Sequence, residues 1–175
     1  MPLVTRRALL QGAGYGFGAL LLPVRFAPAE EAWAVPAETL EALQSSQLVY
    51  ISPLKTDGGE SHCHGEVWFF WDQGAVVIGT GEGTWKARAL AKSLKRARIW
   101  VGDFDRGQKG PEGPFRKGPS FLARAERDTD PATFERLFEA FGKRYADEWG
   151  KWGPRFRSGY ADGSRILIRY TPEGA

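Results

Sequence analysis

The chain has a single cysteine, Cys63, among its 175 residues, so it can form no intrachain disulfide bond. It also lacks internal repeats, and its apolar stretch at residues 8–24 is interrupted by glycines and a glutamine, which argues against a permanent membrane span. The chain also lacks an excess of basic over acidic residues once its first 29 residues are set aside. The net charge is +3, but residues 1–29 carry three arginines and no acid, and beyond them 21 basic residues face 21 acidic ones. The charge therefore gives no indication of nucleic-acid binding.

The first 29 residues have the features of a targeting segment. Arg6 and Arg7 precede the uncharged apolar stretch, and this arrangement is similar to a twin-arginine export signal. Small residues at 27–29 and at 32–34 offer cleavage sites. We expect export by the twin-arginine translocation machinery to the periplasm or another extracytoplasmic compartment, with retention as an N-terminal anchor as the alternative. The 146 residues after position 29 suffice for one domain.

The stretch from residue 62 to residue 94 carries the most specific pattern in the chain. Residues 62–71 are rich in β-branched and aromatic side chains and predict a strand, which ends at the turn signal Asp-Gln-Gly of residues 72–74. Residues 75–80 predict a second strand, followed by a glycine-rich connector. Thr84 is a favourable helix N-cap, and Ala87, Leu90, Ala91 and Leu94 then form one apolar stripe of a helix.

The first turn of that helix is basic. Lys86 and Arg88 lie where the helix dipole is positive, so they cost helix stability unless an anion lies between them. A bound phosphate, with the hydroxyl of Thr84 as a further ligand, is the economical explanation. The alternative is an exposed basic turn that binds nothing.

These residues carry a family resemblance. Glu66, Val67 and Trp68 in the first strand, and the pattern Thr80-x-x-x-Thr84-x-Lys86, resemble the pyridoxamine 5′-phosphate oxidase-like superfamily of flavin-binding split barrels. The resemblance implies that Thr84 and Lys86 hold the phosphate of flavin mononucleotide (FMN). It also implies that Thr80 and the backbone of residues 66–68 line the ribityl chain and ring. Trp85 and Arg88 complete the set of expected cofactor-binding residues.

Three departures from the family pattern limit the function. Ala89 stands where asparagine is common, and Gly65 aligns with an arginine that the vitamin-making oxidases use as a phosphate ligand. The substrate-binding C-terminal signature of those oxidases is not recognisable. Oxidation of pyridoxamine phosphate itself is therefore not expected. Thr84 replaces the usual serine and keeps the hydroxyl.

The remaining pattern completes a mainly β fold. Residues 30–46 predict a linker and a short helix, and residues 47–172 the flavin-binding domain. Further strands are expected at residues 47–54, 98–103, 121–127 and 164–171, giving a six-stranded antiparallel split β-barrel with peripheral helices. Residues 105–120 predict a long glycine- and proline-rich loop, and residues 130–149 a helix, with Trp149 and Trp152 covering either the barrel or a neighbouring subunit's flavin.

Histidines provide a weak metal signal. His62 and His64 would share one face of the first motif strand, but no clear third ligand accompanies them, and we predict no metal site.

The expected function is that of an exported, homodimeric flavoprotein, an oxidoreductase acting on a small-molecule substrate or electron donor. No side chain is identified as catalytic, because in such proteins the cofactor performs the redox chemistry. Two alternatives stay open: a reductase that uses a deazaflavin coenzyme, and a non-catalytic carrier or sensor of flavin or haem.

Overall fold

We describe a computed structural model of the chain over residues 35–104 and 113–174. The expected export signal and the first residues of the linker lie outside these ranges, as does the first part of the predicted loop, residues 105–112. Within the described ranges, no helix combines the length and the apolar character needed to cross a membrane.

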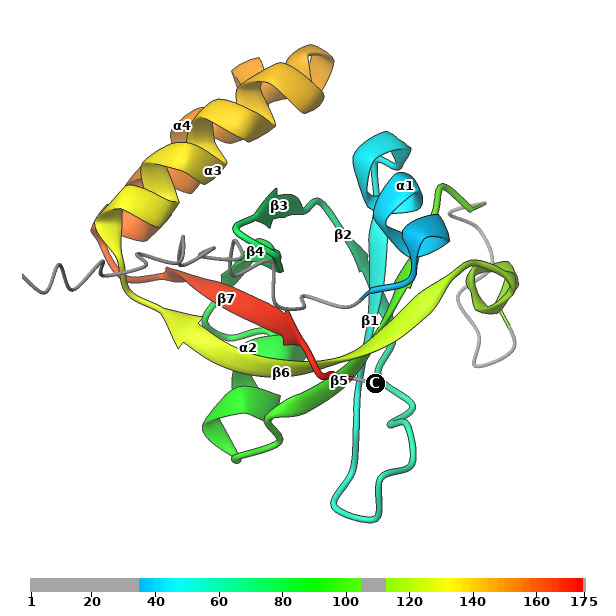
Figure 1. The fold of residues 1–175 in the computed structure, drawn as a ribbon. Helices are drawn as coiled ribbons and strands as arrows, with labels where there is room; N and C mark the ends of the chain where they lie inside the picture. Colours follow the sequence, from blue (N-terminus) through cyan, green and yellow to red (C-terminus); the bar gives the residue numbers. More distant parts are fainter. Residues whose placement is uncertain (1–34, 105–112, 175) are drawn as a thin grey trace, which may run out of the picture. The chain divides into compact units, whose positions relative to one another are not determined.

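The core of the structure is one antiparallel sheet of seven strands in the order β2-β1-β5-β6-β7-β4-β3, which curls into a half-barrel (Figure 1). Its strands are β1 (Val49–Pro53), β2 (Gly65–Val67), β3 (Phe70–Asp72), β4 (Ala75–Gly81), β5 (Arg96–Val101), β6 (Ser120–Asp128) and β7 (Arg165–Pro172). The two edge strands, β2 and β3, are separated by only two residues in the sequence. The chain therefore crosses the opening of the half-barrel between them.

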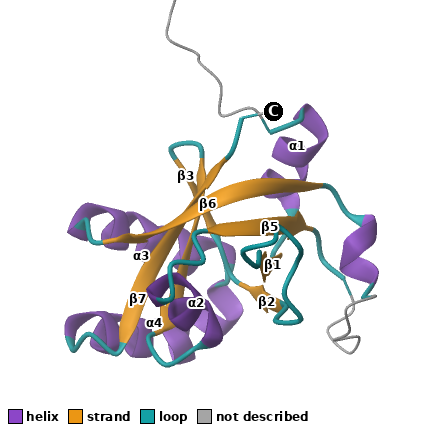
Figure 2. Ribbon diagram, turned by 90° about the horizontal axis from the view of Figure 1, so that it is seen from below, coloured by secondary structure: helices purple, strands orange, loops and turns teal. Residues whose placement is uncertain are grey.

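Four α-helices and one short 3₁₀ helix surround the sheet. They are α1 (Ala37–Ser45), α2 (Trp85–Ala91), the 3₁₀ helix η1 (Pro114–Lys117), α3 (Pro131–Arg144) and α4 (Ala146–Ala161). Helices α3 and α4 run side by side as a hairpin (Figure 1), which packs against β4 and β7 through Val77 and Leu167. Figure 2 shows the same elements from below. Asp130 caps α3 by accepting a hydrogen bond from the backbone N–H of Ala132, and Pro131 occupies the first helical position, as the sequence predicts.

Both faces of the β4–β7 pair are apolar, because one face fills the barrel and the other meets the helices. Val76, Ile78, Ile166 and Ile168 point into the barrel interior. Val77 and Leu167 point to the opposite face of these strands and pack with aromatic side chains of α3 and α4. The helical hairpin is therefore held to the sheet by a second apolar core.

The prediction of six strands is wrong by one, because the expected strand at residues 62–71 is two strands. The break falls at Trp68 and Phe69. The backbone N–H of Phe69 donates to the hydroxyl of Tyr145 at 3.0 Å, and its carbonyl accepts from the same hydroxyl at 3.2 Å. A side chain thus replaces a neighbouring strand at this point.

The prediction of one helix at residues 130–149 is also wrong. Tyr145, with φ −118° and ψ 37°, leaves the helical conformation and separates α3 from α4. Helix α4 then continues through Pro154 to Ala161, although proline usually ends a helix. Trp149 and Trp152 consequently lie on a helix, and Trp149 packs in the hairpin against Phe138 and Phe141 of α3.

Candidate functional site

The strand and connector expected at residues 75–84 are confirmed, whereas the expected helix ends at Ala91, before Leu94. These elements bring two hydroxyls together. Thr84 is the N-cap of α2, and its hydroxyl accepts a long 3.5 Å hydrogen bond from the N–H of Ala87. The hydroxyl of Thr80, near the end of β4, lies 3.0 Å from that of Thr84. Both oxygens therefore lie at the N-terminus of α2, where the resemblance places a phosphate.

Lys86 is the cation of this site. Its ammonium nitrogen lies 4.4 Å from the centroid of the Trp85 ring, and partial burial lowers the pKa of the side chain. No carboxylate within the described residues forms an ion pair with it. A half-buried ammonium without a counter-charge is costly, and a bound anion would offset this cost.

Gly65 is required by the packing of the same two residues. A Cβ atom at this position would lie 2.9 Å from the Cζ2 atom of Trp85 and 3.3 Å from the Nζ atom of Lys86. An arginine, which the vitamin-making oxidases carry at the aligned position, has no room here. The space beside β2 is taken by the Trp85 ring.

Arg88 is directed elsewhere in this structure. Its guanidinium donates to the backbone carbonyl of Gly83, in the connector before α2, and the side chain is exposed. Glu66 is half-buried on β2, where its backbone pairs with that of Tyr50 on β1. The structure thus brings the hydroxyls of Thr80 and Thr84 together and places Lys86 in the first turn of the helix that Thr84 caps.

Two of the residues expected at the flavin ring, Val67 and Trp68, line a cavity of about 270 Å³, whereas Glu66 does not. Its walls are formed by Val67, Trp68, Gly79, Glu148, Trp152, Phe156 and Arg165. Helix α4 packs tightly on β4 at one side of this cavity: a Cβ atom at Gly79 would lie 2.6 Å from the Phe156 ring. Trp152 belongs to this wall, whereas the sequence left its role open. Arg165, Glu148 and Phe156 were missed, since nothing in their local sequence marks them.

This cavity lies on the face of β4 that Gly79 and Gly81 share, with the Thr84 side chain further along it, whereas Thr80 points to the opposite face. A Cβ atom at Gly79 would contact Phe156, and one at Gly81 would lie 3.6 Å from the Cγ2 atom of Thr84. The two glycines face the same side of the strand and are about 7 Å apart, given the rise of a β-strand. A ligand with a phosphate at one end and a planar ring at the other matches this arrangement.

His64 and His62 do not form a metal site with other side chains. The Nδ1 atom of His64 lies 2.7 Å from the Ser52 hydroxyl, and burial, reinforced by the positive charge of Arg116, lowers the pKa of the imidazole. His62 is exposed. Over residues 35–104 and 113–174, no group of three or more His, Cys, Asp or Glu side chains is arranged to hold a metal ion.

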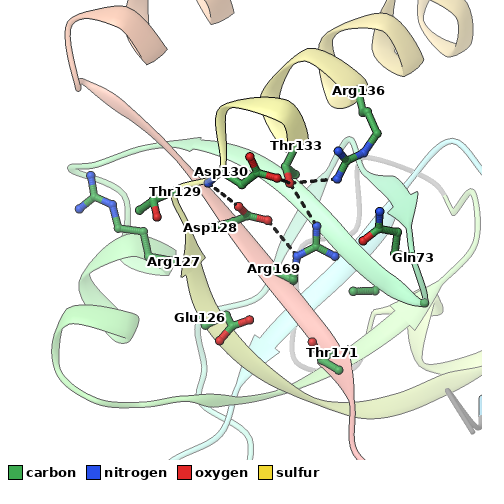
Figure 3. Close-up of a pocket in the computed structure, with 12 residues that line it drawn as sticks. Gln73, Glu126, Arg127, Asp128, Thr129, Asp130, Thr133, Arg136, Arg169 and Thr171 are labelled. Atoms are coloured by element: carbon green, nitrogen blue, oxygen red, sulfur yellow. Dashed lines mark hydrogen bonds and ion pairs between the residues drawn. The ribbon is translucent and has the colours of Figure 1, made fainter. Parts of the chain in front are cut away.

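A larger cavity, of about 950 Å³, lies at the other end of β4 and was not expected (Figure 3). Its charged side chains are largely paired with one another. Arg169 of β7 donates to Asp128 and to Asp72, each across less than 3 Å, and Arg136 of α3 donates to both carboxylate oxygens of Asp72. This network fastens α3 to the β3–β4 turn, so we regard it as structural.

No family model and no curated protein sequence matches the chain. Solved structures do match its fold. HutZ, a heme storage protein from Vibrio cholerae, is 16% identical with a TM-score of 0.54, over 79% of this chain and 89% of that one. A conserved hypothetical protein from Mycobacterium tuberculosis is 19% identical with a TM-score of 0.54, over 80% and 81% of the two chains. A FAD-binding protein from Mesorhizobium loti is 12% identical with a TM-score of 0.50, over 80% and 91%.

These neighbours share the split-barrel fold of the pyridoxamine 5′-phosphate oxidase-like proteins. The fold implied by the resemblance is therefore confirmed. At identities below 20%, the likeness extends to the fold alone.

Proposed function

We propose that this chain is an exported, FMN-binding split-barrel protein and an oxidoreductase other than a pyridoxamine-phosphate oxidase. The observation that carries the proposal is the half-buried ammonium of Lys86, which has no carboxylate partner within the described residues and belongs to the first turn of the helix that Thr84 caps. When bound, a flavin supplies the redox chemistry of the site. The protein's own residues bind the cofactor, orient it and exclude water.

The hydrogen-bond donors at the N-terminus of α2 suit a phosphate monoester. Lys86 supplies a full positive charge, and the two threonine hydroxyls supply hydrogen-bond donors. Helix α2 has only seven residues, so its dipole adds little, and the affinity for the anion depends mainly on Lys86. Gly65 contributes by leaving room for the Trp85 ring, against which the ammonium rests.

The aromatic cavity beside Val67 and Trp68 suits one edge of the flavin ring, which we place along the backbone of residues 66–68 so that the Arg165 end of the cavity stays open. The volume of the cavity, about 270 Å³, is slightly below the range of about 300–1,000 Å³ usual for ligand pockets. One chain therefore encloses only part of a flavin. We propose that a second copy of the chain covers the remainder in a homodimer.

The test compares FMN with riboflavin, which lacks the phosphate. Cofactor-free protein is titrated with each compound, and binding is measured from the quenching of flavin fluorescence. We expect wild type to prefer FMN by about tenfold or more, as one charge-assisted contact provides. Lys86→Gln should lose this preference while keeping its riboflavin affinity. Lys92→Gln, a change at an exposed lysine just after α2, should behave as wild type.

Two results would contradict the proposal. One is FMN affinity that does not respond to Lys86→Gln, and the other is protein that binds neither flavin. The absorption spectrum of protein purified from a host that makes a deazaflavin coenzyme and haem separates the alternative cofactors, because each has its own bands. A haem spectrum would favour the carrier function, and the Vibrio neighbour is a heme storage protein.

Export is tested separately. We propose that the twin-arginine translocation machinery recognises Arg6 and Arg7, and changing both to lysine should retain the protein in the cytoplasmic fraction. Export of this double variant at wild-type levels would overturn the proposed route.

A further inference from the structure

The cavity beside Val67 and Trp68 contains a cation, the guanidinium of Arg165. Arg165 is the first residue of β7. Within the described residues, no carboxylate oxygen lies within 4.0 Å of a nitrogen of its guanidinium, the distance that defines an ion pair. Burial and the nearby charge of Arg155 both lower the pKa of Arg165. The positive charge is therefore uncompensated, in contrast to Arg136 and Arg169 in the larger cavity of Figure 3.

Contacts that leave its donors free hold Arg165 in place. The guanidinium carbon lies 4.4 Å from the centroid of the Phe156 ring. The aliphatic stem packs on α4 at Gly159, where a Cβ atom would lie 2.8 Å from the Cγ atom of Arg165. Neither contact uses the five N–H donors of the side chain. A planar acceptor such as a carboxylate can therefore bind without breaking any of these contacts.

The remaining walls favour an aromatic ring. Trp68, Trp152 and Phe156 all line the cavity. Lys151 and Arg155 lie 5.6 Å and 5.2 Å from the centroid of the Trp152 ring, and they add positive potential to this part of α4. Glu148 also lines the cavity, but it is exposed, so water screens its charge more than that of Arg165.

We propose that this cavity binds a small aromatic carboxylate, with its ring between Trp68 and the Trp152–Phe156 wall and its carboxylate on Arg165. The ligand would be the substrate class of the oxidoreductase, and this assignment rests on the proposed function. Binding to the cavity itself can be measured without a flavin.

The test measures the affinity of the cofactor-free protein for benzoate by isothermal titration calorimetry. Benzamide, a neutral compound of the same shape, and cyclohexanecarboxylate, which is not aromatic, should each bind about tenfold more weakly or worse. Arg165→Gln should weaken benzoate binding by about tenfold or more. Arg157→Gln is the matched control, because Arg157 also lies over phenylalanine rings but faces α3, and it should leave benzoate affinity unchanged.

Equal binding of benzoate and benzamide, or unchanged affinity in a folded Arg165→Gln protein, would overturn the inference. If that variant does not fold, Arg165→Lys keeps the charge and most of the stem. It should still bind benzoate several-fold more weakly than wild type, because the bidentate contact is lost. Wild-type affinity in Arg165→Lys would contradict the assignment.

A final titration separates this inference from the proposed function. Benzoate is titrated into protein already saturated with FMN. Retained benzoate binding supports a substrate site beside the flavin, whereas its loss shows that the flavin ring fills the cavity and overturns the inference alone. If the protein binds benzoate through Arg165 but binds no flavin, the proposed function fails and the aromatic-acid site remains.

Discussion

Tyr145 lies flat against Trp68, with ring centroids 4.2 Å apart and ring planes 6° apart. Its hydroxyl accepts from the N–H of Phe69 at 3.0 Å and shares its one proton between the carbonyls of Gln47, at 2.9 Å, and Phe69, at 3.2 Å. Burial raises the pKa of Tyr145 to about 12, so the hydroxyl keeps its proton at neutral pH. One side chain between α3 and α4 therefore joins the helical hairpin, the break between β2 and β3, and the segment leading into β1.

Tyr145→Phe should destabilise the protein by about 1–3 kcal/mol, because it leaves the buried N–H of Phe69 without its partner. Urea unfolding followed by tryptophan fluorescence measures this loss. Tyr160→Phe is the matched control. Tyr160 also stacks on an aromatic ring, that of Phe134 at 4.0 Å, but its hydroxyl forms no hydrogen bond to a described residue. Equal stability of the two variants would show that the hydroxyl of Tyr145 has no special role.

The break that Tyr145 makes shows which parts of the fold the sequence could predict. Turns and caps depend on neighbouring residues, so the β3–β4 turn at Gln73 and Gly74, with φ of 51° and 79°, and the cap at Asp130 were predicted. The break between β2 and β3 depends on a hydrogen bond between residues 76 positions apart in the chain. No local pattern carries that information.

The candidate site divides in the same way. Thr80, Thr84 and Lys86 lie within seven consecutive residues, so their spacing alone places them at one helix end. The walls of the aromatic cavity come from α4 and β7, more than 60 residues further along the chain. Arg165 reads in the sequence as an ordinary exposed strand residue. Its unpaired charge becomes visible only after the hairpin folds back over β4.

Substitution of Gly79 tests the close packing of Phe156, on α4, against β4. Gly79→Ala should destabilise the protein by about 1–3 kcal/mol, because the new methyl group would lie 2.6 Å from the Phe156 ring. Adding Phe156→Leu should recover part of the loss by removing the clash. Gly83→Ala is the control, since a Cβ atom there meets no other atom within 4 Å. Thermal unfolding of the four proteins measures these effects, and a neutral Gly79→Ala would contradict the packing.

Asp72 should make stability depend on pH in the acid range. Burial alone would raise the pKa of this carboxyl, but hydrogen bonds from Arg136 and Arg169 outweigh it and hold the pKa below its usual 3.8. The carboxylate therefore stabilises the folded protein above about pH 3.8, and this contribution is lost as the pH falls through the folded pKa.

Asp72→Asn isolates this contribution. At pH 7 the variant should be less stable than wild type by about 3 kcal/mol, because Arg136 loses its carboxylate partner and Arg169 keeps only Asp128. The difference should shrink as the pH falls below 3.8, where Asp72 of the wild type takes up a proton. Urea unfolding from pH 7 to pH 3 measures it, with Glu139→Gln as a control for an exposed ion pair. Parallel stability curves for wild type and Asp72→Asn would contradict the assignment.

Lys86 should reveal a conflict between stability and binding. Lys86→Met keeps an unbranched stem against Trp85 and removes a half-buried charge. The free energy of unfolding of the ligand-free variant should therefore be no more than about 0.5 kcal/mol below that of the wild type. The folded pKa of Lys86 is lowered, so the wild type should gain stability relative to Lys86→Met as the pH rises towards 10.5 and the ammonium loses its proton. FMN should raise the melting temperature of the wild type more than that of the variant. A large loss of stability in ligand-free Lys86→Met would instead show that the ammonium serves the fold.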